Sequence, residues 1–297
     1  NGRFEYLEQA LSRNLNASVL QNGLFTFSAG GGQAGSLRII TGNLVLRDGA
    51  VATTTTVAGG AGGNLTVDAN SIELYTAGLI TGTTGIGNAG NLTVTTGRLF
   101  GRNAGVISTA TIGRGTGGTI NVTASESVEM IGFTPTRSPI APEASSGLLA
   151  VTFAGGTAGD VILNTPRLIL RDGAVVSAAS LVPGGGKGGN VTAIVTDSVE
   201  ASGTTTAGTF RSGLFVTTRG EDTGNLYLET PRLTLRNGAR VSASSLGVGD
   251  GGTVTVIAPE FVEISGVSAD GRSPSGLFSF SGELNLTTGR IDGTGAS

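Results

Sequence analysis

The chain of 297 residues is rich in glycine, with 52, and poor in charge, with 13% charged residues and a formal net charge of −3. It contains no cysteine and no histidine, which excludes disulfides, thiol chemistry and the commonest general base and metal ligand. The slightly negative balance gives no electrostatic footprint for nucleic acid, so no nucleic-acid partner is expected. The first residues show neither a signal peptide nor an apolar stretch long enough to span a membrane.

Residues 1–22 differ from the rest of the chain. Apolar side chains recur there at helical spacing among polar ones, at Phe4, Leu7, Leu11 and Leu15. We predict a loop or a short helix that belongs to a preceding coil or caps this one. Residues 23–297 are predicted to form one repeat domain. The closing phrase LNLTTGRIDGTGAS reads as an interrupted repeat, so we interpret the chain as an internal segment of a larger protein.

A glycine placed before a short apolar run marks each repeat. These marker glycines are Gly35, Gly63, Gly90, Gly118, Gly159, Gly189, Gly224, Gly252 and Gly282. Most of them follow one another at intervals of about 28 residues, and two longer intervals, after Gly118 and after Gly189, indicate insertions. Self-similarity at such a period is typical of stacked repeat architectures.

Within one repeat unit three short runs alternate between apolar and polar residues. In the unit that starts at Gly159 the runs are DVILN, RLIL and AVVSAAS. Val161 and Leu163 point to one side of their run, and Asn164 points to the other. Period-two alternation with β-branched residues and glycine-bearing turns predicts strands rather than helices.

Such short strands bury a face only when equivalent runs of successive units stack, with parallel pairing at about 4.8 Å. We therefore predict an all-β fold: a right-handed parallel β-helix of about nine coils, each with three short strands. The residue after each marker glycine is polar, as at Asn64, Asn91 and Asn190. We expect these side chains to form a hydrogen-bonded ladder along the rod.

Two kinds of unit alternate along the chain. One carries a phrase such as RLILRDGAVVSA, and the other carries a phrase such as SVE followed by a variable loop and SGLF. The variable loops, at 131–145, 203–211 and 266–274, occupy the same place in the second kind, so we predict that they line up at one corner. Loops on a solenoid edge are the usual place for binding. The candidate interaction residues in these loops are Phe133, Arg137, Glu143, Phe210, Arg211, Asp270 and Arg272.

The tandem tokens GGNLTV, RLxLRDGAxVSAS and SGLF resemble the repeat regions of filamentous-haemagglutinin-like exoproteins of the two-partner secretion type, particularly the cyanobacterial ones. The resemblance covers the chain from Asn22 onward, but no match to the secretion domain of that family is found. It implies a large secreted protein, exported through an outer-membrane transporter, whose β-helical shaft acts in adhesion or surface association.

An enzymatic function would require catalytic side chains that lie close together. Many parallel β-helices act on polysaccharides with paired carboxylates, whereas the acidic residues here recur with the repeat, as Glu73, Glu129, Glu200 and Glu263. Such a ladder is interpreted as a solvated face. The Asp or Asn in the RDG and RNG turns is interpreted as a turn former. Asp250, in GVGDGGTV, is a weak match to calcium-binding repeats, and we expect no catalytic, cofactor or metal site.

The leading prediction for function is structural. The chain would be the shaft of an extracellular, surface-associated adhesin-like protein that presents loops to glycans or matrix components. End-to-end or lateral self-association is also expected, because an uncapped coil exposes a strand edge. The alternative is a carbohydrate-binding or polysaccharide-degrading β-helix, against which the few tyrosines and the absence of tryptophan count.

Overall fold

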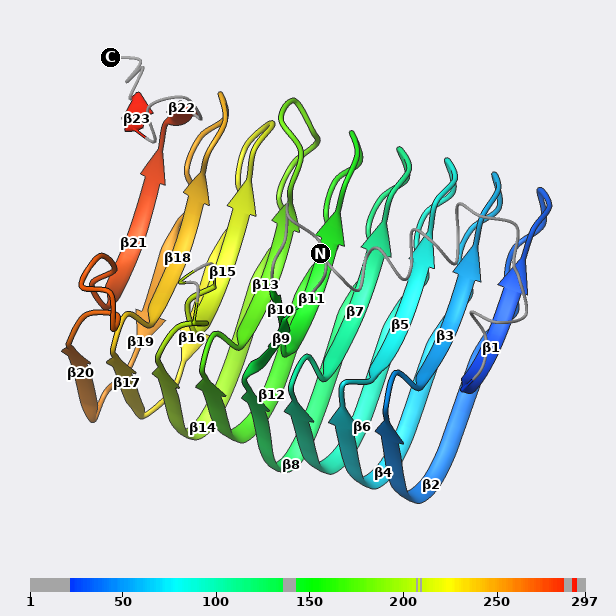
Figure 1. Ribbon diagram of the computed structural model, residues 1–297, viewed down its shortest axis with the longest axis horizontal. Coiled ribbons are helices and arrows are strands. Elements are labelled where there is room, and N and C mark those ends of the chain that lie inside the picture. The colour runs from blue at the N-terminus through cyan, green and yellow to red at the C-terminus, as the bar shows by residue number, and fades with distance from the viewer. Residues whose placement is uncertain (1–21, 136–142, 207, 209, 286–289, 293–297) are drawn as a thin grey trace.

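The computed structural model describes residues 22–135, 143–206, 208, 210–285 and 290–292. Every regular element in these ranges is a β-strand, and the strands stack coil upon coil in chain order (Figure 1). The predicted all-β parallel solenoid is therefore confirmed. No helix long and apolar enough to cross a membrane occurs in the described part. The prediction for residues 1–22 falls outside it, apart from Asn22.

One side of each coil contributes a six-residue strand to a nine-stranded sheet, called sheet A. Every pairing in sheet A is parallel and unshifted, which confirms the expected number of coils. Its strands, in spatial order, are β1 (Gly23–Ser28), β3 (Val51–Thr56), β5 (Gly78–Thr83), β7 (Val106–Thr111), β11 (Gly147–Thr152), β13 (Val175–Ser180), β15 (Gly213–Thr218), β18 (Arg240–Ser245) and β21 (Gly276–Ser281).

The rest of each coil contributes to a ten-stranded parallel sheet, called sheet B. It consists of β2 (Leu37–Arg47), β4 (Leu65–Tyr75), β6 (Leu92–Arg102), β8 (Ile120–Ile131), β12 (Val161–Arg171), β14 (Val191–Ser202), β16 (Leu226–Glu229), β17 (Arg232–Arg236), β19 (Val254–Ile257) and β20 (Phe261–Ser265). The expected three short strands are separate only in the last two coils of sheet B. In the others the first two runs join into one long strand.

A recurrent hydroxyl marks the place where the two runs meet. Thr165 Oγ1 donates to the carbonyl oxygen of Arg167 at 3.2 Å, and Thr230 repeats this bond to Arg232 at 3.1 Å. The pairing register shifts beside Pro166, yet β12 continues through it. At Pro231 the ladder is interrupted and β16 and β17 are separate strands, each still paired with β14.

Alternation along the strands divides core from surface as predicted. Val161 and Leu163 are fully buried in the single continuous core between the two sheets, whereas Asn164 is half-buried on the outer side. Inward residues in the end coils are more exposed, with Leu24 at 47% and Leu277 at 41%, because each has a neighbouring coil on one side only.

The outward positions of sheet A follow a rule with a period of two coils. Large apolar residues on alternate strands, such as Ile80, Leu149 and Phe215, are separated by small hydroxyl residues such as Ser108 and Ser177. The phrase SGLF therefore places its leucine in the core and its last residue on the outer face of sheet A.

Two short antiparallel pairs lie outside the stack: β9 (Phe133–Pro135) with β10 (Glu143–Ser145), and β22 (Glu283–Asn285) with β23 (Arg290–Asp292). The second pair corrects one expectation. The marker Gly282 predicts a further parallel strand on sheet B, but Glu283–Asn285 instead pairs with the chain that follows it. Each full coil contributes strands to both sheet A and sheet B. After Gly282 the described residues contribute no further strand to sheet A.

Candidate functional site: the loop corner and its groove

Each coil turns at two main corners, and they are built differently. The turn that leads into sheet B carries the marker glycine and is called the ladder corner. The turn that leads from sheet B into sheet A carries the variable loops and is called the loop corner.

The predicted polar ladder is present at the ladder corner. Asn64 Oδ1 accepts a hydrogen bond from the backbone N–H of Asn91 at 2.9 Å, and Asn91 Oδ1 accepts one from Thr119 at 2.9 Å. The series resumes with Asp160, Asn190, Asn225 and Thr253 at 2.7 to 2.9 Å. Each side chain thus satisfies a backbone donor of the next coil, where the sheet ladder has not yet begun.

The marker glycines stack so closely that a side chain has no room. A Cβ at Gly159 would lie 1.9 Å from the carbonyl oxygen of Gly118, and one at Gly252 would lie 1.9 Å from that of Gly224. Among the markers from Gly35 to Gly252, only Gly35 is open, with its nearest contact at 3.9 Å on Thr26. The ladder corner therefore fixes both residue type and spacing from coil to coil.

At the loop corner, coils of the first kind make a fixed turn. Asp48, Asn103, Asp172 and Asn237 all have φ between 50° and 55°, which confirms their interpretation as turn formers in the left-handed region. Glycine follows in three of the four turns, and Ala104 follows in the other, at φ 64°. These turns carry no insertion.

Coils of the second kind carry the insertions, and all three insertions leave and rejoin the coil in the same way. Each begins after a glycine with φ of 75° to 81° and ends before a serine whose N–H donates to that glycine's carbonyl oxygen at 3.0 to 3.1 Å. The pairs are Gly132 with Ser146, Gly203 with Ser212, and Gly266 with Ser275. In the coil of β4 and β5 the equivalent residues, Thr76 and Ala77, are joined directly.

The closing serine also ties the insertion to the coil before it. Ser212 Oγ accepts a hydrogen bond from the N–H of Gly173 at 2.9 Å and donates to the carbonyl oxygen of Ser202 at 2.7 Å. Ser146 and Ser275 make the equivalent pair of bonds. The SGLF phrase repeats for two reasons. Its serine hydrogen-bonds to the turn of the preceding coil, and its glycine lies so close to a backbone carbonyl of the next coil that a side chain has no room, as at Gly213.

The predicted interaction residues are placed at this corner as far as the structure describes them. Phe133 lies half-buried on β9 and Glu143 is part of β10, whereas Arg137 falls outside the described residues. Phe210 and Arg211 lie side by side in one groove. Neither Asp270 nor Arg272 lines that groove.

Neighbouring insertions contact one another. Arg211 Nε donates to Ser273 Oγ at 3.0 Å, which joins the insertion before β15 to the one before β21. Within the latter, Asp270 accepts hydrogen bonds from Ser268 and from the backbone of Arg272, and these bonds lower the pKa of Asp270 below its ordinary value. The last two insertions of the row are therefore joined by a side-chain hydrogen bond.

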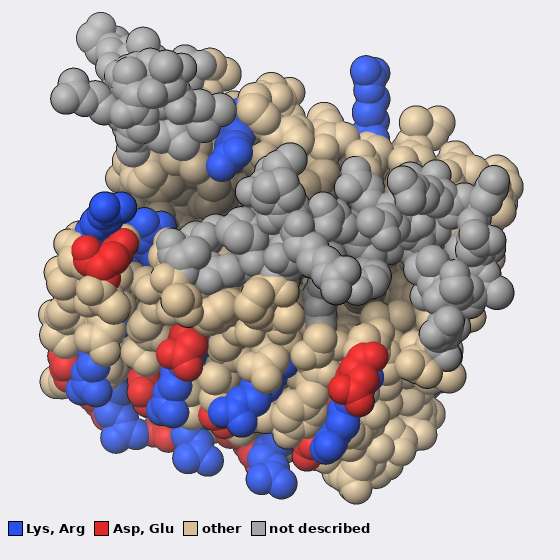
Figure 2. All heavy atoms as spheres, in the orientation of Figure 1, with Lys and Arg blue, Asp and Glu red and all other residues tan. Residues whose placement is uncertain are grey.

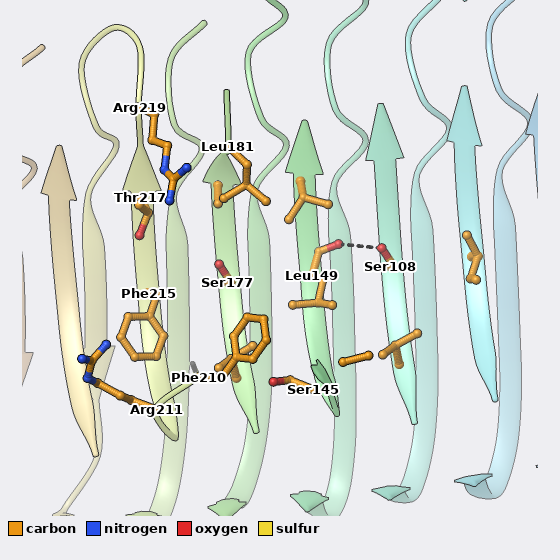
Figure 3. Close-up of a pocket in the computed structure, with 16 residues that line it drawn as sticks. Ser108, Ser145, Leu149, Ser177, Leu181, Phe210, Arg211, Phe215, Thr217 and Arg219 are labelled. Atoms are coloured by element: carbon orange, nitrogen blue, oxygen red, sulfur yellow. Dashed lines mark hydrogen bonds between the residues drawn. The ribbon is translucent and has the colours of Figure 1, made fainter. Parts of the chain in front are cut away.

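Beside this row a groove of about 310 Å³ crosses the outer face of sheet A between β5 and β15 (Figure 3). Leu149, Leu181 and Phe215 supply apolar lining, with Arg211 and Arg219 on the β15 flank. Sequence reasoning identified Phe210 and Arg211 but missed the sheet residues. The signal was the last letter of SGLF, which is large and apolar and faces outward.

The repeated glutamates lie on the other side of the molecule, and three of them are paired with an arginine of the preceding coil. The pairs are Arg47 with Glu73 at 3.5 Å, Arg171 with Glu200 at 3.1 Å, and Arg236 with Glu263 at 2.7 Å. Figure 2 shows such charges alternating along the edge that carries sheet B. Glu129 is in no ion pair among the described residues.

The calcium alternative rested on a single aspartate, Asp250, and the structure corrects that premise. Asp222 occupies the equivalent place in the preceding coil, and its Oδ1 accepts from the N–H of Asp250 at 3.2 Å. Its Oδ2 accepts from Lys187 at 3.4 Å. Both bonds lower the pKa of Asp222. In the described part of the chain no three metal-ligating side chains gather closely enough to hold a metal ion.

Comparison with known proteins adds no relative: no family model, no curated protein and no solved structure matches the chain.

Proposed function

We propose that this chain is the β-helical shaft of a secreted, surface-associated exoprotein, and that its work is to hold the insertions of the loop corner in a row for adhesion. The observation that carries the proposal is the common base of the three insertions. One serine and one glycine close each of them onto a rigid coil, so loop sequence and coil sequence can vary independently.

The rigidity of the base supports a binding role. A loop on a packed scaffold keeps its shape on binding and loses little conformational entropy. The loop bases are tied by buried serines, and Ser146 and Ser212 are each 0% exposed. The contact of Arg211 with Ser273 then joins two insertions into one surface. Such a surface suits an extended partner better than a small molecule.

We further propose extracellular glycans or matrix components as the partners, the outer cell surface as the location and an outer-membrane transporter as the route of export. These assignments follow from the resemblance of the repeat tokens to filamentous-haemagglutinin-like exoproteins. The arrangement of the loops agrees with them, because an adhesive shaft needs a regular rod with variable edge loops.

Removal of the insertions one at a time tests the proposal. In each variant the first glycine is joined directly to the closing serine, as Thr76 and Ala77 are joined in the chain itself. We expect the variants without 133–145 or 204–211 to lose binding on a glycan array or to immobilised cells, while thermal unfolding stays close to that of the parent.

A matched control is a change at the opposite corner. Replacement of Pro183 and Gly184, which are both exposed, should leave binding intact. Binding that survives removal of all three insertions would overturn the proposal. So would release of sugar from a polysaccharide panel, because that result would favour the carbohydrate-degrading alternative.

A further inference from the structure

Arg240 departs from the repeat at one position of sheet A. The other three coils of the first kind begin the equivalent strand with a valine that pairs with glycines of the coils on either side. These valines are Val51, Val106 and Val175. β18 keeps the glycine neighbours, Gly213 and Gly276, but has arginine in the place of valine. Valine satisfies the stack in three coils, so stacking does not require the arginine.

The guanidinium of Arg240 is held at the loop corner by the last insertion. Its Nε donates to the carbonyl oxygen of Pro274 at 3.0 Å, and its Cζ lies 4.4 Å from the centre of the Phe278 ring. The adjacent residue, Ser273, accepts from Nε of Arg211 at 3.0 Å. Two consecutive residues thus hold two guanidinium groups, and the terminal nitrogens of both have no hydrogen bond within the described part of the chain.

No carboxylate neutralises these two charges. Neither Arg211 nor Arg240 is in an ion pair among the described residues. The insertion that ends at Arg211 contains no acidic residue, and Asp270 in the last insertion is in no described ion pair either. Burial lowers the pKa of Arg240, and the charge of Arg211 lowers it further. Two partly desolvated cations without an anion favour a negatively charged ligand.

The surroundings of the two arginines suit a sugar ring better than a peptide. Phe210 and Phe215 lie beside Arg211 (Figure 3), and aromatic rings offer a flat apolar surface to the C–H groups of a pyranose. β18 is paired on both sides, with β15 and β21, so an extended peptide finds no free strand edge to join. Recognition at this place depends on side chains, and the planar fork of arginine matches a carboxylate with two parallel hydrogen bonds.

We propose that Arg211 and Arg240 form a binding site for the carboxylates of an acidic polysaccharide, such as a chain of uronic acids. Each guanidinium binds a carboxylate through its terminal nitrogens, while its Nε stays bonded to the last insertion. The inference rests on the proposed function, because it names the class of glycan that the loop corner binds.

Oligogalacturonate and its methyl ester test the site, because they share the sugar ring and differ in the carboxylate. We expect the chain to bind the acid, measured by isothermal titration calorimetry, and to bind the ester about tenfold more weakly. Arg211→Gln with Arg240→Gln should weaken binding of the acid by a similar factor. The matched control, Arg38→Gln with Arg114→Gln, removes the same charge at two exposed positions elsewhere and should leave the affinity unchanged.

Chemical modification of the parent chain avoids any effect of substitution on folding. Phenylglyoxal reacts with accessible arginines, and both Arg211 and Arg240 are partly exposed. Oligogalacturonate should slow their modification several-fold, measured by peptide mass spectrometry, while Arg38 reacts at the same rate with and without it. Equal protection of all three would indicate a general charge effect and would contradict a site at the loop corner.

Three results of the binding assay would overturn the inference: equal losses in the two double variants, equal affinity for the acid and its ester, or tighter binding of polyglutamate, which would make an acidic protein the partner. Failure of the inference is distinguishable from failure of the proposed function. If the parent chain does not bind oligogalacturonate, yet removal of the insertions abolishes binding to other glycans or to cells, this inference alone is wrong.

Discussion

The two corners of each coil obey opposite rules. At the ladder corner every coil repeats a glycine followed by a polar side chain, and a Cβ at most marker glycines would lie about 2 Å from a backbone carbonyl oxygen of the coil before. At the loop corner only alternate coils are fixed, by turns such as that at Asp172. The coils between them admit insertions of different length and sequence.

This difference shows where the stack tolerates change. Contacts at the ladder corner join each coil to both of its neighbours through the backbone. A substitution that disturbs one of these contacts therefore affects three coils. The insertions at the loop corner are held by one serine and one glycine, and they add contacts without replacing any. The variable part of the molecule is therefore the part whose removal restores an ordinary coil.

The largest effect is expected from a side chain in the glycine stack. Gly159→Ala would place its Cβ 1.9 Å from the carbonyl oxygen of Gly118, which the sheets on either side hold in place. We expect a loss of about 3 kcal/mol in the free energy of unfolding, at the upper end of overpacking costs. Denaturant unfolding measures it. Gly35→Ala is the control and should be nearly neutral, and equal losses in the two variants would contradict the stacking account.

A smaller loss is expected at the base of an insertion. Ser212→Ala leaves the N–H of Gly173 buried without its acceptor, and we expect a loss of about 2 kcal/mol, typical of an unsatisfied buried donor. Faster amide exchange at Gly173 should accompany it. Ser125→Ala, at an exposed position on β8, should change neither quantity. A neutral Ser212→Ala would show that the insertion does not depend on its serine.

The fixed turns should tolerate a side chain at a moderate cost. Gly49 has φ 83° and open space around its Cβ position, and Ala104 already occupies the equivalent place in another coil. We therefore expect Gly49→Ala to cost about 1 kcal/mol, the strain of one left-handed residue. Gly31→Ala, with equally open space and no positive φ, supplies the reference in the same thermal unfolding assay. A loss of unfolding free energy in Gly49→Ala that exceeds the loss in Ser212→Ala would contradict the expected order of the two effects.

The smallest effect concerns an ion pair that joins two coils near the loop corner. Both oxygens of Glu263 accept from the Arg236 guanidinium at 2.7 Å, and these bonds, with that of Ser265, lower the pKa of Glu263. Because the folded pKa is lower than the unfolded one, the pair stabilises the fold above the ordinary glutamate value of about 4.5. This stabilisation is lost as the pH falls through the lowered value.

An NMR titration of the Glu263 side chain checks this expectation. Arg236→Gln should bring its pKa back toward the ordinary value. The pair is exposed to solvent, so added salt should weaken the effect. An unchanged titration in Arg236→Gln would assign the shift to Ser265 alone.

Much of the fold could be predicted because it is written in local alternation. The alternation at Val161 and Leu163 indicates which side chains are in the core, and the spacing of the marker glycines indicates the length of a coil. Both patterns recur because every coil must stack on the one before. The polar ladder was predictable for the same reason. The merging of two runs into one strand was not, because Gly97 and Pro166 between the runs indicate a break, which β6 and β12 override by pairing with the coils on either side.

The candidate site was only partly predictable. The insertions are visible as interruptions of the period, so Phe210 and Arg211 could be selected. Their neighbours Leu149 and Phe215 could not be selected from the sequence. These sheet residues line the groove only because strands that are separated by an insertion pair in register with β13. The stacked Asp222 and Asp250 are a different case: each stands two residues before its marker, Gly224 or Gly252, so the repeat period alone could have revealed them.

The alternation of coil types has a consequence for growth of the rod. The serine of an SGLF coil bonds to the turn of the coil before it, and the outer row of sheet A pairs large residues with small ones. A single added or deleted coil would bring two like coils into contact and leave both arrangements unmatched. The natural module is therefore a pair of coils, and changes of length by whole pairs preserve every interface.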